Sequence, residues 1–134
     1  FRNLGFSPNY VDQRHPPLWI GGGSPAAIRR TARVGDGWHP TNITSAEYAQ
    51  GASDLRDQAL ELGRNPDLIE RSIRFDVVTD GGPSPARVAE LEARMSLFAD
   101  AGVEHAVLAL TGDNTQVLRD WMVAISERFA CTKS

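Results

Sequence analysis

The sequence predicts an α/β fold with parallel strands, and three observations support this prediction. Short apolar runs alternate with segments of helical periodicity along the whole chain. Two Ser-Pro pairs, at residues 24–25 and 84–85, stand where helices should begin, and glycines stand where helices should end. Alternating strands and helices give parallel strands joined by right-handed crossovers. Periodicity alone leaves open whether these units form a small open sheet or part of a barrel.

Four strands are expected, and each should be followed by a helix. Their expected positions are residues 18–21, 36–39, 73–79 and 104–110. Residues 1–15 show neither period and read as a connecting arm, while residues 16–130 hold the β/α units. The 134 residues fit one domain. A complete eight-unit barrel needs ~250 residues, so four units correspond to about half of one.

The first two helices have recognisable ends. Ser24 and Pro25 predict the start of the first, and Gly35 should end it in the left-handed conformation. Ser45 is expected to cap the second helix, and Gly63 is expected to stop it. An apolar stripe marks the core-facing side of this second helix, at Tyr48, Ala52, Leu55, Ala59 and Leu62.

The last two helices follow the same rules. The pair Ser84-Pro85 should start the third helix, which runs to Gly102, and Asp113 or Asn114 should cap the fourth. The third helix has an apolar face at Val88, Leu91, Met95 and Phe98, and the fourth has one at Leu118, Trp121, Ile125 and Phe129. Both faces are expected to pack against the sheet.

Composition excludes several classes of function. The net charge of −3 and the lack of a Lys or Arg run argue against nucleic-acid binding. No apolar stretch approaches the ~20 residues that span a bilayer, so we expect a cytoplasmic protein without a membrane partner. The single cysteine, Cys131, has no nearby ligand and is expected to be chemically idle, and no metal site is predicted. The sequence also offers no Ser-His-Asp grouping of the kind that hydrolases use.

The strongest chemical signal is a glycine loop between the first strand and the first helix. Gly21, Gly22 and Gly23 follow the strand directly, and Ser24 caps the helix. Free backbone N–H groups at the positive end of a helix dipole bind phosphate, and glycines let the backbone approach the anion closely. The loop has neither the Lys-Ser/Thr ending of a nucleoside-triphosphate loop nor the G-x-G-x-x-G spacing of a dinucleotide site. A tight structural turn is the alternative interpretation.

A longer string surrounds this loop. Residues 17–27 read Pro-Leu-Trp-Ile-Gly-Gly-Gly-Ser-Pro-Ala-Ala, and residues 35–38 read Gly-Asp-Gly-Trp. Later segments, Leu-Gly-Arg-Asn-Pro at 62–66 and Ala-Gly-Val-Glu-His at 101–105, follow in order. Together they resemble the luciferase-like monooxygenase family, especially its branch that uses the deazaflavin F420. One departure is Asn65, where the family usually has Asp.

This resemblance implies the C-terminal half of a TIM barrel, holding strands five to eight. It implies a flavin- or F420-dependent oxidoreductase or monooxygenase that acts on a small organic substrate, with F420 or FMN bound through its phosphate. The implied cofactor-binding residues are Gly21, Gly22, Gly23, Ser24 and Trp38. The catalytic residues are not identified, because the first four strands of the family, which usually supply them, are missing.

The incomplete barrel has two further consequences. A half-barrel exposes two sheet edges and an inner face, so self-association or pairing with an N-terminal half is expected. A non-catalytic binding or assembly module is the alternative function. His39, Arg29 and Arg30 are weaker candidates for the site, because each is more often a solvated or hydrogen-bonded residue in such positions.

Overall fold

The computed structural model describes residues 16–129. Four strands alternate with four helices and one short 3₁₀ helix, η1, in the order β1 (Trp19–Gly21), α1 (Pro25–Val34), β2 (Gly37–His39), α2 (Ser45–Glu61), η1 (Pro66–Leu68), β3 (Glu70–Val78), α3 (Pro85–Asp100), β4 (His105–Thr111) and α4 (Thr115–Phe129). The four predicted strands are confirmed. β3 begins three residues earlier than the apolar pattern indicated, because polar residues at its start still pair with β2.

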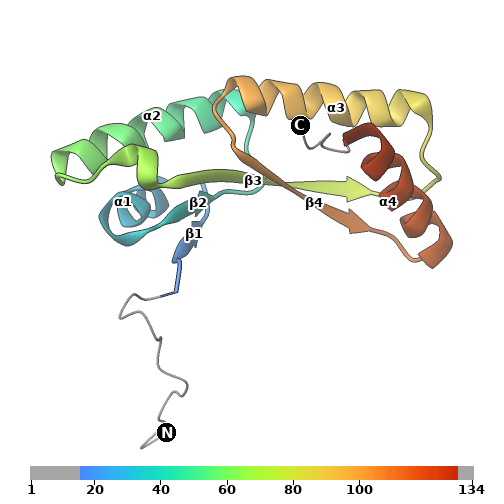
Figure 1. Cartoon of the computed structure of the whole chain (residues 1–134), viewed down its shortest axis with the longest axis horizontal. Coiled ribbons are helices and arrows are strands. Elements are labelled where there is room, and N and C mark those ends of the chain that lie inside the picture. Colours follow the sequence, from blue (N-terminus) through green and yellow to red (C-terminus); the bar gives the residue numbers. More distant parts are fainter. Residues whose placement is uncertain (1–15, 130–134) are drawn as a thin grey trace, which may run out of the picture.

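The strands form one parallel sheet in the order β1-β2-β3-β4 (Figure 1). Trp19 pairs with Gly37, Trp38 pairs with Arg71, and Ser72 pairs with His105. Each strand therefore lies beside its neighbour in the sequence. Within residues 16–129 no strand pair is antiparallel, which agrees with the prediction of parallel strands in successive β/α units.

The helices pack against one face of the sheet. Ile28 of α1, Tyr48 of α2 and Phe98 of α3 share one core with alternate side chains of the strands. A second cluster joins Trp121 of α4 to Val77 of β3. A doubly wound sheet reverses its strand order and carries helices on both faces, whereas this one runs in sequence with helices on one face. The arrangement is that of barrel segments.

The opposite face, which we call the open face, is concave. It carries the other alternate side chains, Trp19, His39, Ser72, Arg74, Asp76, Val78, His105 and Val107. The rings of Trp19 on β1 and His105 on β4 lie 6.4 Å apart, so side chains from the two outer strands meet over this face across β2 and β3. A sheet that curls toward this face, as the wall of a barrel does, brings side chains of its outer strands together in this way.

Helix starts follow the predicted chemistry with one exception. The Ser24 and Ser84 side chains accept hydrogen bonds from the backbone N–H groups of Ala27 and Arg87, so both predicted caps are confirmed. The prediction that Ser45 caps α2 is wrong. Thr44 is the cap, and it forms a capping box in which the Glu47 carboxylate accepts from the Thr44 N–H at 2.7 Å. A capping box needs a Glu or Gln three positions after the cap, and Glu47 has that spacing from Thr44 but not from Ser45.

Helix ends contain a second correction. Gly63 and Gly102 adopt positive φ values of 69° and 92° after α2 and α3, as helix-ending glycines do. The expectation of a left-handed Gly35 is wrong, since its φ is −79°. The reason for a glycine there is close packing: a Cβ at Gly35 would lie 3.0 Å from the Cα of Thr31.

Two more details concern the remaining helices. Asn114 rather than Asp113 caps α4, since its side-chain oxygen accepts from the N–H of Gln116 at 2.9 Å. Leu62, expected on the core side of α2, is 56% exposed because it lies at the helix end, where the stripe has turned away from the sheet. None of the helices in the described part of the chain is long and apolar enough to cross a membrane.

Candidate functional site

The glycine loop lies where the carboxyl end of β1 meets the start of α1. Ser24 has an extended backbone and caps the helix through its side chain, at 3.3 Å from the N–H of Ala27, and Pro25 takes the first helical position. Gly22 has a φ of 97°, which side-chain-bearing residues rarely adopt. This turn directs the chain from the strand into the helix within three residues.

Several backbone N–H groups of this loop remain available to a ligand. Within residues 16–129, the N–H groups of Gly23, Ser24 and Ala26 donate no hydrogen bond to another part of the chain. They lie at the amino end of a ten-residue helix, where the peptide dipoles sum to a partial positive charge. Unpaired N–H groups in that position form an anion-binding site of the kind that holds phosphate.

The glycines of the loop have distinct structural reasons. A side chain at Gly22 would be strained by the positive φ, and a Cβ at Gly23 would come within 2.9 Å of the Ile43 side chain. At Gly21 the nearest atom to a Cβ would be the His39 carbonyl at 3.7 Å, an ordinary contact. Substitution of Gly22 or Gly23 would therefore disturb the local fold as well as a ligand.

Trp38 lies beneath the loop and does not line the open face. Its side chain is fully buried, and its indole Nε1–H donates to the carbonyl oxygen of Gly22 at 2.9 Å. The ring stacks on Tyr48 with centroids 4.8 Å apart. Trp38 thus supports the loop from the core side, and a direct contact with a cofactor stays a prediction.

His39 reaches the open face at the carboxyl end of β2, next to the loop. Its Nδ1 lies 2.6 Å from the Ser72 hydroxyl, and its ring meets Trp19 edge to face with centroids 6.0 Å apart. Burial, and then the nearby Arg74, lower the pKa of His39 below its ordinary value. The imidazole is therefore neutral at pH 7 and can exchange hydrogen bonds with a molecule on this face.

The open face also carries an ion pair in its middle. The guanidinium of Arg74 lies 2.8 Å from the carboxylate of Asp76, and both side chains remain about two-fifths exposed. These charges sit where the interior of a closed barrel would be. Ser72, Arg74 and Asp76 received no role from the sequence, but their alternation with Ile73, Phe75 and Val77 could have identified them as one face of a strand.

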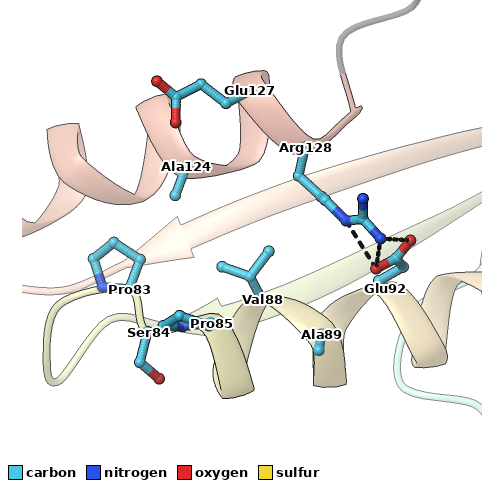
Figure 2. A pocket seen from close by; sticks show the side chains of 9 residues that line it. All are labelled: Pro83, Ser84, Pro85, Val88, Ala89, Glu92, Ala124, Glu127 and Arg128. Carbon is cyan, nitrogen blue, oxygen red and sulfur yellow. Dashed lines mark hydrogen bonds and ion pairs between the residues drawn. The ribbon is translucent and has the colours of Figure 1, made fainter.

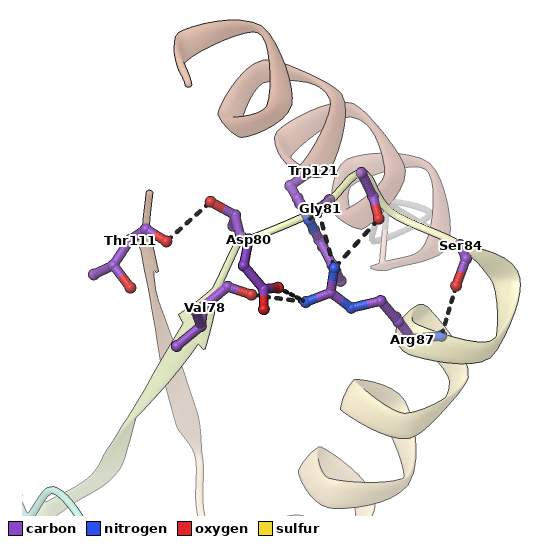
Figure 3. Close-up of polar contacts among 9 residues, drawn as sticks. Val78, Asp80, Gly81, Ser84, Arg87, Thr111 and Trp121 are labelled. Atoms are coloured by element: carbon purple, nitrogen blue, oxygen red, sulfur yellow. Dashed lines mark hydrogen bonds and ion pairs between the residues drawn. The ribbon is translucent and has the colours of Figure 1, made fainter. Parts of the chain in front are cut away.

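A second glycine turn stands at the carboxyl end of β3, and it is closed by side chains (Figure 3). Arg87 donates to the carbonyl oxygens of Val78 at 2.8 Å and Gly81 at 3.0 Å, and to the carboxylate of Asp80 at 3.0 Å. Its guanidinium lies 4.9 Å from the ring centre of Trp121. The carbonyl groups and the carboxylate in this turn face a cation, so the turn is unsuited to an anion.

One hollow lies away from the first glycine loop, between α3 and α4 (Figure 2). It has a volume of about 540 Å³ and is lined mainly by apolar side chains, including Val88 and Ala124. At one end Glu92 and Arg128 form an ion pair at 2.6 Å, which occupies both charges. The groove belongs to the outer helical layer and adds nothing to the loop site.

The other candidates are not brought into the loop site by any contact. Arg29 and Arg30 are exposed on α1 and line a hollow of about 500 Å³ beside the end of α2. The part of the chain that the structure describes contains no group of three His, Cys, Asp or Glu side chains able to hold a metal. Cys131 lies outside the described residues.

Comparison with known proteins agrees with this geometry. Residues 2–117 match the family of luciferase-like monooxygenases. The chain belongs to this family. No curated protein matches, but many solved structures do. One is an F420-dependent secondary alcohol dehydrogenase in complex with an F420–acetone adduct, with a TM-score of 0.69 and 13% identity over 91% of this chain and 50% of that one.

Two further structures have the same fold. A riboflavin lyase with modified FMN and the substrate riboflavin matches with a TM-score of 0.65 and 14% identity, over 96% of this chain and 47% of that one. A coenzyme F420-dependent tetrahydromethanopterin reductase from Methanopyrus kandleri matches with a TM-score of 0.53 and 12% identity, over 71% and 45%. The luciferase-like chain therefore spans about half the length of the structures it matches, and the α/β fold with TIM-barrel-like units is confirmed.

Proposed function

We propose that this luciferase-like chain supplies the phosphate-binding part of an oxidoreductase that uses F420 or FMN and acts on a small organic molecule. One observation supports this function above the others: the N–H groups of Gly23, Ser24 and Ala26 are unpaired within residues 16–129 at the start of α1. The cofactor would supply hydride transfer or oxygen activation, as it does in such enzymes generally. The chain's own part is to hold and orient the cofactor phosphate.

The residues present fit a phosphate group. The Ser24 hydroxyl accepts from Ala27, so its own hydrogen is available to a phosphate oxygen. Glycine at positions 22 and 23 adds no side chain of its own beside the N–H groups. The neutral His39 lies on the open face at the carboxyl end of β2, next to the loop, and the Trp19 ring contacts it edge to face. The rest of a cofactor would extend over this face.

The test compares FMN with riboflavin, which differs by lacking the phosphate. The full chain should bind FMN more tightly than riboflavin, as measured by titration with flavin fluorescence, and Ser24→Ala should reduce this preference. Ser84→Ala is the matched control, because it removes an equivalent cap from α3 at the same 3.3 Å distance. Equal affinities for FMN and riboflavin in the unmodified chain would contradict the proposed phosphate site.

Parallel titration with F420 addresses the choice of cofactor. The strings at residues 17–27 and 35–38 resemble the F420-using branch of the family and so favour F420. The loop itself would accept the phosphate of either molecule. A monooxygenase reaction and a cytoplasmic location stay predictions. Somewhat tighter binding of F420 than of FMN is the expected outcome.

We further propose that additional β/α units of the same fold cover the open face, either from an N-terminal half-barrel or from a second copy of the chain. The proposal is supported by the concave face, by the outer edges of β1 and β4 and by the coverage of about half of the matching structures. Light scattering should report a dimer, or a complex when an N-terminal half is added. A stable monomer that ignores the added half would contradict this assembly.

The alternative function is a non-catalytic module for binding or assembly. The two functions differ in what happens after the barrel is completed. An oxidoreductase completed by its partner should oxidise a reduced cofactor in the presence of an electron acceptor, with loss or gain of the cofactor absorbance. A module should bind its partner without this change.

A further inference from the structure

The two glycine turns of this chain share an unusual construction. Each follows a strand, ends in a Ser-Pro helix start and has one backbone carbonyl held by an indole N–H. Trp38 donates to the carbonyl oxygen of Gly22, and Trp121 donates to that of Gly81, both at 2.9 Å. The first tryptophan comes from β2 and the second from α4. The same device therefore supports both turns from different elements.

The hydrogen bond from Trp38 determines where the next N–H group points. In a planar trans peptide the carbonyl and the N–H of one unit point in opposite directions. The carbonyl of Gly22 points into the core toward the indole, so the N–H of Gly23, in the same peptide unit, points outward. This N–H is one of those that remain unpaired within residues 16–129.

Trp38 is held firmly enough to set this direction. Its ring is fully buried and stacks on Tyr48 at 4.8 Å. Gly51, one turn further along α2, leaves the outer edge of the ring just enough room, since a Cβ at that position would come within 2.6 Å of it. Because the ring cannot swing away without opening the core, its N–H fixes the Gly22 carbonyl in one orientation.

Although the N–H groups of Ser84 and Ala86 also donate no hydrogen bond within residues 16–129, the second turn is less suited to an anion than the first. Pro83 has no N–H, Asp80 adds a negative charge, and the Arg87 guanidinium is already engaged by the carbonyl of Gly81. The bond from Trp121 to Gly81 therefore has a structural role alone. This difference makes Trp121 a matched control for Trp38.

We propose that Trp38 is a positioning residue, whose indole N–H aims the Gly23 N–H at the cofactor phosphate without touching the cofactor. The proposal rests on the proposed function of the loop. The Gly-Asp-Gly-Trp segment would thus contribute to phosphate recognition indirectly, through the backbone of the glycine loop.

The first experiment compares Trp38→Phe with Trp121→Phe in the full chain. Phenylalanine keeps a ring in the core but removes the donor. Trp38→Phe should reduce the affinity for FMN by about tenfold, the loss of one hydrogen bond to a charged group, and leave riboflavin binding nearly unchanged. Trp121→Phe should lower the midpoint of urea unfolding about as much as Trp38→Phe does. It should nevertheless preserve the preference for FMN over riboflavin.

The outcomes separate this proposal from the one on which it rests. If the unmodified chain prefers FMN and Trp38→Phe keeps that preference in full, the positioning role is wrong and the phosphate loop stands. If the unmodified chain shows no preference, the phosphate loop fails and the positioning role fails with it. A loss of preference in both Trp variants would also overturn the assignment, because it would mark a general structural effect.

A second measurement needs no variant and so does not depend on folding. In ¹⁵N-labelled chain, FMN should shift the resonances of the Gly23 amide and the Trp38 indole together, while riboflavin should leave both in place. The Trp121 indole is the internal reference and should not move with either molecule. A Gly23 amide that responds to FMN while the Trp38 indole stays unchanged would overturn the proposed coupling.

Discussion

The indole of Trp19 lies directly over Gly37 on the open face. A Cβ at Gly37 would come within 2.7 Å of the Trp19 ring, so the strand pair β1–β2 depends on a glycine there. Trp19 in turn contacts the rings of His39 and His105. One glycine of the Gly-Asp-Gly-Trp segment thus makes room for the aromatic residue that bridges the curled sheet.

Gly37→Ala should therefore displace the Trp19 ring and destabilise the fold by about 1–3 kcal/mol, the usual cost of overpacking. Urea denaturation measures the change. Gly82→Ala is the control, since no atom lies within 4 Å of a Cβ there. Adding Trp19→Ala to Gly37→Ala should recover much of the loss, and two strictly additive substitutions would show that the contact is unimportant.

Arg64 supports the helix that carries the phosphate loop. Its guanidinium donates to the carbonyl oxygens of Thr31, Ala32 and Gly35 at 3.0, 2.8 and 2.8 Å, at the carboxyl end of α1. Arg64→Met should cost about 2–3 kcal/mol in unfolding free energy, because hydrogen bonds to charged groups are worth more than neutral ones.

The control for Arg64 is an arginine in an exposed ion pair. Arg56 contacts Asp67 at 3.3 Å, and both side chains are mostly exposed. Arg56→Met should change the unfolding free energy by less than about 1 kcal/mol. If thermal or urea unfolding gave the same change for both variants, the capping role of Arg64 would have to be abandoned.

Thr44 and Ser45 provide a test of the start of α2. Thr44→Ala removes the capping box with Glu47 and should destabilise the fold by about 1 kcal/mol. Ser45→Ala changes the neighbouring hydroxyl, which caps nothing in the structure, and should have little effect. Calorimetry of the two variants shows which residue caps α2. A larger loss of stability for Ser45→Ala than for Thr44→Ala would contradict the structure.

His39 gives the fold a dependence on pH. Its pKa is lowered by burial and then by Arg74, so the unfolded chain binds a proton more readily than the folded one. The neutral form is native, and stability should fall as the pH drops below the ordinary value of 6.5 toward the lowered folded value. Urea midpoints at pH 7.5 and 5.5 measure this change.

His39→Gln should reduce the drop in the urea midpoint between those two pH values. Glutamine cannot take up a proton, but it retains a hydrogen-bonding side chain for Ser72. NMR titration of the His39 ring provides a direct check on the same point. A measured pKa at or above 6.5 would remove the reason for the effect.

The element order and most helix ends were predictable because they depend on local chemistry. The apolar runs, the Ser-Pro starts and Gly63 act within a few residues of themselves, so the sequence reports them directly. The caps were predicted less well at α2, where two adjacent hydroxyl residues competed and the partner Glu47 decided. Local residue type alone does not rank such neighbours.

The site was predictable in part for the same reason. A glycine loop before a helix start is visible in the sequence, and the structure adds that Gly23 and Ser24 keep unpaired N–H groups within the described residues. Trp38 lies behind Gly22, which is 16 positions away in the sequence, and His39 lies beside Ser72, which is 33 positions away. No periodic pattern contains such pairings.

By itself, the sequence determined the alternation of strands and helices, the position of the glycine loop and the resemblance to luciferase-like proteins. Only the tertiary structure decided that the sheet runs in sequential order, with helices on one face and a concave open face on the other. It also decided that Trp38 serves the loop from within the core. The physical reason is that strand pairing and side-chain packing depend on contacts between distant residues, whereas periodicity and capping depend on near neighbours.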